Sequence, residues 1–335
     1  MEPVPAPPPR KRKGRAIGCF LLILLLLVAA AGFTALQLWA RPGPANANVT
    51  VVIPEGASLY RAANELEKAG AIRSAREFAL LARLFGGGGQ VKAGEFRLLA
   101  HQSQSDIFQD LLGGRTLQLK FTVPEGRSAV QVYEALMKAE GLTGSIDVPA
   151  EGSVMPDTYA YTRGDSRAAV LARMQKAMAD YLQAAWARRK PGIAVNTPEE
   201  AVILAAIVEK ETGKPEERRM VAGVYSNRLK RGMMLQADPT VIYPVTKGKP
   251  LGRRILRSEL DAVNDYNTYT MTGLPKGPIA NPGRASIDAV LDPAPTSAIY
   301  FVADGSGGHV FADTLEQHNA NVEKWRALRR ERGEM

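Results

Sequence analysis

The segment Ala201-Val-Ile-Leu-Ala-Ala-Ile-Val-Glu-Lys-Glu-Thr-Gly213 decides the fold of this chain, because an apolar run leads directly to two carboxylates and then to a glycine. Just before it, Thr197 can cap the free N–H groups of a helix, and Pro198 fits the first helical turn. Gly213 and Pro215 are typical of a helix end. Since apolar residues occupy nearly all sides, the segment predicts a buried helix whose last turn carries partly desolvated carboxylates.

Two glutamates lie on that last turn, and burial would let either one keep its proton near neutral pH. At about 3.6 residues per turn, Glu211 continues the face of Leu204 and Val208, whereas Glu209 follows Val202. Both faces are apolar, so helix geometry does not separate the two glutamates. The alternative is that both are solvated beside lysines at a helix end, as such glutamates usually are.

The N-terminal part combines a basic run with a long apolar run. The chain has 335 residues, a formal charge of +9 and 45% hydrophobic residues, which suits two or three folded units and excludes a disordered protein. Arg10–Lys13 and Arg15 favour either nucleic acid or a membrane face. Residues 16–40 carry no charge, and about 20 such residues cross a bilayer, so we predict a transmembrane helix and no nucleic acid. The positive-inside rule places residues 1–15 in the cytoplasm and the chain after Arg41 outside it.

A cleaved signal peptide is the alternative to a retained anchor, because Ala45-Asn-Ala47 has the small residues that a signal peptidase accepts. The apolar run exceeds the usual signal length of about 7–15 residues, which favours the anchor. Residues 41–48 predict a short stiff linker. The single cysteine, Cys19, lies in the apolar run, and the three histidines are scattered, so neither a disulfide nor a metal site is expected.

An internal repeat begins the exported part. Val51-Val-Ile-Pro-Glu-Gly-Ala-Ser58 is echoed by Phe121-Thr-Val-Pro-Glu-Gly-Arg-Ser128, and each copy is typical of a strand, a turn and an amphipathic helix. In the first copy, a second helix over residues 74–85 and a returning strand over residues 92–98 follow. Periodicity further predicts helices over residues 166–189 and 314–330, and strands at Val241–Tyr243 and Ile299–Ala303.

The second half of the chain carries a series of motifs in a fixed order. They are Val208-Glu-Lys-Glu-Thr212, Val224-Tyr-Ser-Asn-Arg-Leu229, Gly232-Met-Met-Leu-Gln-Ala-Asp-Pro-Thr-Val241, Tyr266-Asn-Thr-Tyr269, Gly273-Leu-Pro275, Pro278-Ile-Ala280, Pro282-Gly283 and Tyr300-Phe-Val-Ala-Asp304. Together they closely resemble the endolytic murein transglycosylase family, the YceG-like proteins of the bacterial cell envelope. The resemblance covers roughly residues 49–330.

The resemblance implies an enzyme that cleaves peptidoglycan glycan strands with one catalytic glutamate, leaves 1,6-anhydromuramoyl ends and needs no cofactor. Other lytic transglycosylases carry that glutamate in a Glu-Ser pair, and Glu211-Thr212 is more similar to such a pair than Glu209-Lys210 is. Glu211 is therefore the predicted catalytic residue, with Glu209 as the reserve. The same motifs supply amide, carboxylate and aromatic groups suited to sugars, although each taken singly has an ordinary structural role open to it. The predicted substrate-binding residues are Asn227, Gln236, Asp238, Tyr266, Asn267 and Tyr269.

We therefore expect an α+β protein with a single N-terminal transmembrane helix. A small LysM-like domain over residues 49–120 is implied by the resemblance, with a plain spacer as the alternative. A second strand-helix unit over residues 121–150 leads into a mainly helical catalytic domain with added strands over residues 151–330. The expected location is the bacterial inner membrane, single-pass, with the catalytic domain periplasmic. Glycan strands and, by family analogy, peptidoglycan synthases are the expected partners; a non-catalytic peptidoglycan-binding scaffold and a muramidase-type hydrolase are the alternative functions.

Overall fold

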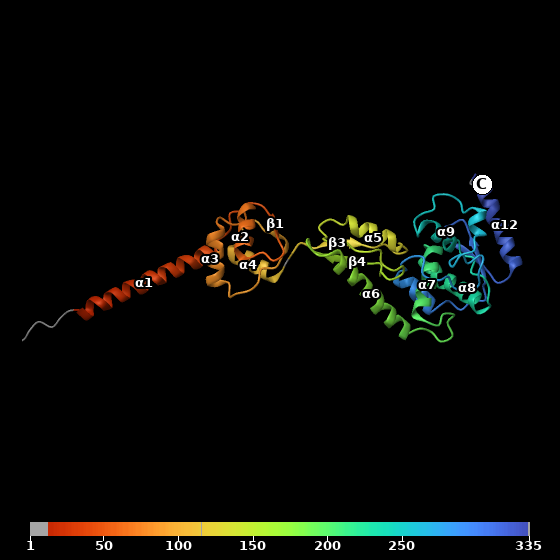
Figure 1. Ribbon diagram of the computed structural model, residues 1–335, viewed down its shortest axis with the longest axis horizontal. Coiled ribbons are helices and arrows are strands. Elements are labelled where there is room, and N and C mark those ends of the chain that lie inside the picture. Colours follow the sequence, from red (N-terminus) through yellow and green to blue (C-terminus); the bar gives the residue numbers. More distant parts are fainter. Residues whose placement is uncertain (1–12, 115, 334–335) are drawn as a thin grey trace, which may run out of the picture. The chain divides into compact units, whose positions relative to one another are not determined.

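The computed structural model describes residues 13–114 and 116–333 (Figure 1). This part of the chain forms twelve α-helices and three two-stranded antiparallel sheets, which confirms a mixed helix and strand fold. It divides into two compact units. Unit 1 comprises the residues up to Gln118 together with Thr162–Gly164, and unit 2 comprises Leu119–Tyr161 together with the residues from Asp165 onward. Most of the predicted cytoplasmic tail lies outside the described residues.

Helix α1, Lys13–Ala40, occupies the apolar run, as expected. Ile17–Ala40 has 24 residues and a mean hydropathy of 2.8, so it is long and apolar enough to cross a membrane. Most of its leucines, such as Leu25 at 65% exposure, project away from the protein, whereas Leu38 packs against the core of unit 1. A long apolar surface of this kind is stable in lipid rather than in water.

The end of α1 belongs to the core of unit 1. Trp39 is only 6% exposed, and its ring centroid lies 5.8 Å from those of both Phe78 and Phe108. The following residues 41–48, expected as a linker, also contact unit 1: the Ala45 carbonyl accepts a hydrogen bond from the His101 N–H at 2.8 Å, and the Asn48 side chain accepts one from the Ala100 N–H at 3.0 Å. The apolar helix and unit 1 therefore share one core without an intervening free tether.

Unit 1 has the expected order of strand, helix, helix and strand. β1 (Val49–Ile53) pairs with β2 (Gly94–Leu98), and α2 (Leu59–Lys68) and α3 (Ala75–Phe85) lie between them in the sequence. The side chains of Ser58 and Ser74 cap the two helices, as short polar side chains at a helix start do. A further helix, α4 (Gln104–Gly113), was not expected from the sequence.

The second copy of the repeat opens unit 2. β3 (Leu119–Thr122) is followed by α5 (Ala129–Lys138), with Ser128 at its start, and pairs with β4 (Thr158–Tyr161). The long α6 (Arg167–Ala187) then follows, capped by the Ser166 side chain. Apolar side chains of these elements form one core cluster, which includes Val132, Leu136, Val170 and Met174.

Helix α7 (Pro198–Glu211) is the centre of unit 2, as the sequence predicts. Thr197 accepts a hydrogen bond from the Glu200 N–H at 3.2 Å, which begins the helix. Every residue from Leu204 to Val208 is fully buried, because α6, α8 (Arg218–Lys230) and α11 (Arg284–Leu291) pack around it. A short 3-10 helix, η1 (Pro215–Glu217), connects α7 to α8.

The strand expected at Val241–Tyr243 is wrong, because these residues lie within helix α9 (Asp238–Thr246). Pro239 favours a helix start, and the Thr240 hydroxyl donates a hydrogen bond to the Ala237 carbonyl at 2.7 Å, so these local features prevail over the strand preference of the β-branched residues. The other expected strand is confirmed as β5 (Tyr300–Ala303), which pairs with β6 (His309–Ala312). α10 (Arg257–Leu260) and the C-terminal α12 (Leu315–Glu331) complete the unit, and α12 packs on the β5–β6 hairpin.

Candidate active site

A polar cavity of about 280 Å³ lies at the C-terminal end of α7. Its walls come from α7, α8, α9, α12, the β5 strand, the loop between α8 and α9 and the loop between α10 and α11. The residues that line it are Glu211, Tyr225, Arg228, Leu235, Gln236, Asp238, Tyr269, Phe301 and His318. Acidic, cationic, amide and aromatic groups therefore meet in one hollow large enough for part of a polar ligand.

Glu211 has the properties of a general acid. Its Oε1 atom is buried and has no hydrogen-bond partner, whereas the carboxyl receives a hydrogen bond from Tyr225. Burial, assisted by the charge of Asp238, raises the pKa of Glu211 to about 7, although the Tyr225 bond and Arg228 act in the opposite direction. Near neutral pH this carboxyl exists in both protonation states, so it can give a proton and take one back.

Glu209, in contrast, is hydrogen-bonded to other parts of the fold. Its Oε2 accepts hydrogen bonds from the Gly283 N–H at 2.9 Å and the Ser286 hydroxyl at 2.7 Å, and its Oε1 lies 3.7 Å from Nη2 of Arg218. The side chain is 6% exposed and does not line the cavity. Of the two glutamates on the last turn, Glu211 alone lines this cavity, which favours the prediction that it is the catalytic residue.

Three of the six predicted substrate-binding residues line the cavity. The Tyr269 hydroxyl donates a hydrogen bond to Oδ1 of Asp238 at 2.6 Å, which orients that carboxylate. Gln236 has a left-handed backbone with φ of +52°, an uncommon conformation for a residue other than glycine. Its N–H is held by the Thr268 carbonyl at 3.0 Å and its Oε1 accepts a hydrogen bond from Arg228 at 3.4 Å, so the structure around it maintains this conformation.

The other three predicted residues lie outside the cavity. Asn227 donates its amide hydrogens to the Thr296 and Ala298 carbonyls, at 2.8 and 3.0 Å, and so braces α8. Asn267 is fully buried and donates to three backbone carbonyls of the α10 region. Tyr266 packs against Tyr243, with ring centroids 5.0 Å apart. The amide groups of the two asparagines are thus occupied within the fold.

Tyr225 and Arg228 were missed from the sequence, although both belong to the motif from which Asn227 was chosen. Arg228 is 8% exposed, and it donates hydrogen bonds to the Ile299 carbonyl at 2.7 Å and the Leu235 carbonyl at 2.8 Å. Their spacing of three residues places Tyr225 and Arg228 on one face of a helix, but it does not show which face borders the cavity.

His318 on α12 was also missed, because it follows the motif series. Its ring stacks on Tyr300 with centroids 5.1 Å apart, and its Nδ1 atom is buried without a hydrogen-bond partner. Burial, with the charge of Arg228, lowers the pKa of His318, so the imidazole that lines the cavity is neutral at pH 7.

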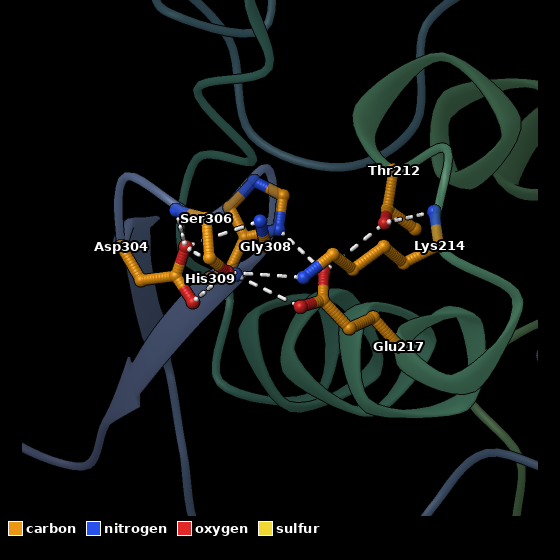
Figure 2. Close-up of polar contacts among 7 residues, drawn as sticks. All are labelled: Thr212, Lys214, Glu217, Asp304, Ser306, Gly308 and His309. Atoms are coloured by element: carbon orange, nitrogen blue, oxygen red, sulfur yellow. Dashed lines mark hydrogen bonds and ion pairs between the residues drawn. The ribbon is translucent and has the colours of Figure 1, made fainter.

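A polar network fixes the chain just after Glu211 (Figure 2). Thr212 donates its hydroxyl to Oε2 of Glu217 at 3.1 Å, and the same oxygen lies 2.7 Å from Nδ1 of His309. The His309 N–H donates to Oε1 of Glu217 at 2.9 Å. Burial alone would raise the pKa of Glu217, but the His309 and Thr212 hydrogen bonds hold that pKa below its usual value. The β6 strand is thereby connected to the end of α7, where Glu211 lies.

The same network has a second branch on the β5–β6 turn. Lys214 donates from Nζ to the Ser306 hydroxyl at 3.1 Å, and the Ser306 hydroxyl in turn donates to the Asp304 carboxylate at 2.9 Å (Figure 2).

Among residues 13–114 and 116–333, no group of three or more His, Cys, Asp and Glu side chains is placed to hold a metal ion.

A buried acid at a helix end, in a polar cavity with few apolar walls, defines an enzyme-like site of the acid–base class. The chain belongs to the YceG-like family, whose family model matches residues 51–324. It is 30% identical over 322 residues to the endolytic murein transglycosylase of Bacillus subtilis (strain 168), covering 86% of this chain and 88% of that protein.

Two further relatives agree with this membership. The endolytic murein transglycosylase of Streptococcus pneumoniae serotype 2 (strain D39 / NCTC 7466) is 28% identical over 333 residues, covering 83% of this chain and 59% of that longer protein. The crystal structure of a yceG-like protein from Listeria monocytogenes matches with a TM-score of 0.50 and 27% identity, covering 82% of this chain and 98% of that one. The resemblance found in the sequence motifs is confirmed.

Proposed function

We propose that this chain is an endolytic murein transglycosylase, which cleaves the bond between N-acetylmuramic acid and N-acetylglucosamine within peptidoglycan glycan strands. One observation carries the proposal: the carboxyl of Glu211 has an unpartnered oxygen at a polar cavity and a pKa of about 7. The family membership and the names of the relatives support the same activity.

Glu211 acts twice in the proposed reaction. As an acid it protonates the oxygen that links the two sugars, and the C1–O bond of the muramoyl residue breaks as positive charge develops at C1. As a base, the resulting carboxylate takes the proton from the C6 hydroxyl of the same sugar, whose oxygen then bonds to C1. The product is a 1,6-anhydro ring, Glu211 regains its proton, and no water is consumed.

The neighbouring groups bind the sugar and stabilise the charge. The carboxylate of Asp238, oriented by Tyr269, is suited to stabilise the positive charge that develops at C1. The exposed amide of Gln236 is suited to the acetamido and hydroxyl groups of the sugar. Asn227, Tyr266 and Asn267 act through the fold in this proposal, since none of them lines the cavity.

A muramidase-type hydrolase is the second candidate, because Asp238 places another carboxylate in the same cavity. Hydrolases use a second carboxylate to activate water or to attack the sugar. The products separate the two reactions. We expect the full-length protein in detergent to release 1,6-anhydromuramoyl ends from purified peptidoglycan, whereas reducing muramic ends alone would establish hydrolysis. A non-catalytic scaffold would bind the sacculus and create no new ends of either kind.

We also propose that α1 is a retained single-pass anchor in the bacterial inner membrane, with residues 1–15 cytoplasmic and units 1 and 2 periplasmic. The exposed apolar surface of α1 supports this, and so does Trp39, because cleavage after Ala47 would remove that side chain from the core of unit 1. An anchored enzyme would meet nascent strands near the membrane before mature wall. Fractionated cells should contain full-length protein in the inner membrane, and a soluble form beginning near Asn48 would refute the anchor.

Unit 1 is proposed as a LysM-like module, on the basis of its strand, helix, helix and strand order. Modules of that kind bind N-acetylglucosamine chains, so unit 1 would hold a strand while unit 2 cuts it. Chitooligosaccharides should then protect amides of unit 1 from hydrogen exchange. Protection confined to unit 2 would leave unit 1 with the role of a spacer. Contact with peptidoglycan synthases is proposed by family analogy alone.

A further inference from the structure

A second cavity in unit 2, of about 350 Å³, is separate from the one that holds Glu211. Its apolar walls include Ile242, Leu251 and Ile279. Tyr243 adds an aromatic wall whose position is fixed from two sides: its hydroxyl donates to Oε2 of Glu151 at 3.1 Å, and its ring packs on Tyr266. The cavity is therefore a preformed hollow with rigid, mostly apolar walls.

The charges around this second cavity are predominantly positive. Arg127, Lys210 and Lys249 line it, against the single carboxylate of Glu125. Lys249 pairs with Glu134 at 2.6 Å, and Glu125 pairs with Arg218 at 3.4 Å. Within the described residues, the exposed side chains of Arg127 and Lys210 show no ion pair or side-chain hydrogen bond, and only the backbone carbonyl of Arg127 accepts one from Asn281. Two positively charged side chains without ion-pair partners thus border a mostly apolar cavity, and this combination suits a ligand with carboxylates and small apolar groups.

The two cavities are next to each other along the same two helices. On α7, Lys210 lines the second cavity and the adjacent Glu211 lines the first. On α9, Pro239 lines the second and the adjacent Asp238 lines the first. Since an α-helix with its side chains is about 10–12 Å across, a group bound in one cavity lies within reach of a chain bound in the other. A substrate cut at Glu211 can therefore extend a side branch toward Arg127 and Lys210.

We propose that the second cavity binds the short carboxylate-bearing peptide carried by a muramoyl residue beside the scissile bond. The inference rests on the proposed function, because it takes peptidoglycan as the ligand. In peptidoglycan this peptide is attached through the lactyl group of N-acetylmuramic acid, and it combines alanine methyl groups with free carboxylates. The alanines match the walls formed by Ile242 and Tyr243, and the carboxylates match Arg127 and Lys210. Substrate choice is then set by the peptide as well as by the sugar.

Binding tests the proposal without requiring turnover. The full chain carrying Glu211→Gln, in detergent, is titrated with three labelled glycan preparations of equal length. The first bears its peptides, the second has had them removed by an amidase, and the third bears peptides whose carboxylates have been converted to amides. Amidase treatment hydrolyses the amide bond to the first alanine, so the second preparation lacks the peptide but carries a new lactyl carboxylate on each muramoyl residue. The third preparation keeps the peptide and gains no charge, so it reports on the peptide carboxylates.

We expect peptide-bearing strands to bind about tenfold more tightly than either of the other two preparations. Adding Arg127→Gln and Lys210→Gln together should abolish this preference, and raising the salt concentration should weaken it in the parent protein. The matched control is Lys120→Gln with Lys230→Gln, which removes the same charge from exposed positions outside both cavities and should keep the preference.

The proposal would be overturned if amidated strands bound as tightly as native ones, or if the preference survived in the Arg127 and Lys210 double variant. If the double variant lost affinity for all three preparations to the same extent, this would also count against the proposal, because it would indicate general damage to the site. Failure of the proposed function is seen separately, as an absence of 1,6-anhydro ends when the wild-type protein meets any of the three preparations.

Discussion

Replacing Glu211 by Gln should abolish cleavage and at the same time stabilise unit 2 above neutral pH. The pKa of Glu211 is about 7 in the folded protein against an ordinary value of 4.5. Below pH 4.5 both the folded and the unfolded states hold the proton, so no free energy is lost. As the pH rises from 4.5 to 7, the unfolded state releases a proton that the folded state retains, and stability falls. The loss is complete above pH 7 and amounts to about 3 kcal/mol.

Glutamine has no titratable proton, so the variant should not show this pH-dependent loss of stability. Urea unfolding of unit 2 can be followed through Trp186 on α6, at pH 5 and at pH 8. The free energy of unfolding of the variant, measured relative to wild type, should be about 2–3 kcal/mol higher at pH 8 than at pH 5, which means that the variant gains stability. This difference between two pH values cancels any constant effect of the substitution. It also cancels the contribution of Glu151, whose pKa burial likewise raises to about 7 in both proteins.

Glu209→Gln is the matched control, because it makes the same chemical change two residues away. Glu209 accepts hydrogen bonds from Gly283 and Ser286 and does not line the cavity, so this variant tests whether the gain in stability at pH 8 belongs to the position of Glu211. If the Glu211 variant shows the same relative stability at pH 5 and pH 8, the carboxyl is not desolvated in the folded protein. An active Glu211→Gln protein beside an inactive Glu209→Gln protein would reverse the catalytic assignment.

Three further predictions concern residues that support the site or the anchor. Glu209→Gln should lose about 2–4 kcal/mol of stability while keeping much of its activity per folded molecule, as urea unfolding and product release on the same sample would reveal. Trp39→Ala should destabilise unit 1 by about 3–5 kcal/mol and leave the unfolding of unit 2 unchanged in calorimetry; an unaltered transition for unit 1 would show that the packing on Phe78 and Phe108 is unimportant. His309→Ala should lower kcat about tenfold with little change in KM, because the end of α7 loses the connection to β6 that His309 makes through Glu217. A tenfold rise in KM with kcat unchanged would instead indicate that His309 acts in substrate binding.

The helices could be predicted where their signals lie within one or two turns of the sequence. Thr197 before Pro198 begins α7, and the serines before α2, α3 and α6 cap those helices, because a capping side chain bonds to a backbone N–H only three residues away. The apolar run of α1 was similarly evident from length and composition. Val241–Tyr243 was assigned wrongly because β-branched residues suit a strand, yet the start of α9 and the bonds between Thr240 and Thr268 hold a helix there.

The site shows what tertiary structure alone decides. The order of motifs was sufficient to recognise the family, and it brought Gln236, Asp238 and Tyr269 into the candidate set. It could not show that Tyr225 and Arg228, rather than Asn227, line the cavity, because that depends on how α8 packs.

The choice between Glu209 and Glu211 also depends on the tertiary structure. Both lie on apolar faces of one helix, and their environments are set by residues distant in the chain: Gly283 and Ser286 bond to Glu209, whereas Tyr225 and Asp238 surround Glu211. The sequence by itself determined that a buried helix ends in two carboxylates. Only the tertiary structure decided which of them accepts hydrogen bonds within the fold and which is left at a cavity with an unpartnered oxygen, because burial and bonding partners arise from contacts between elements that are far apart in the sequence.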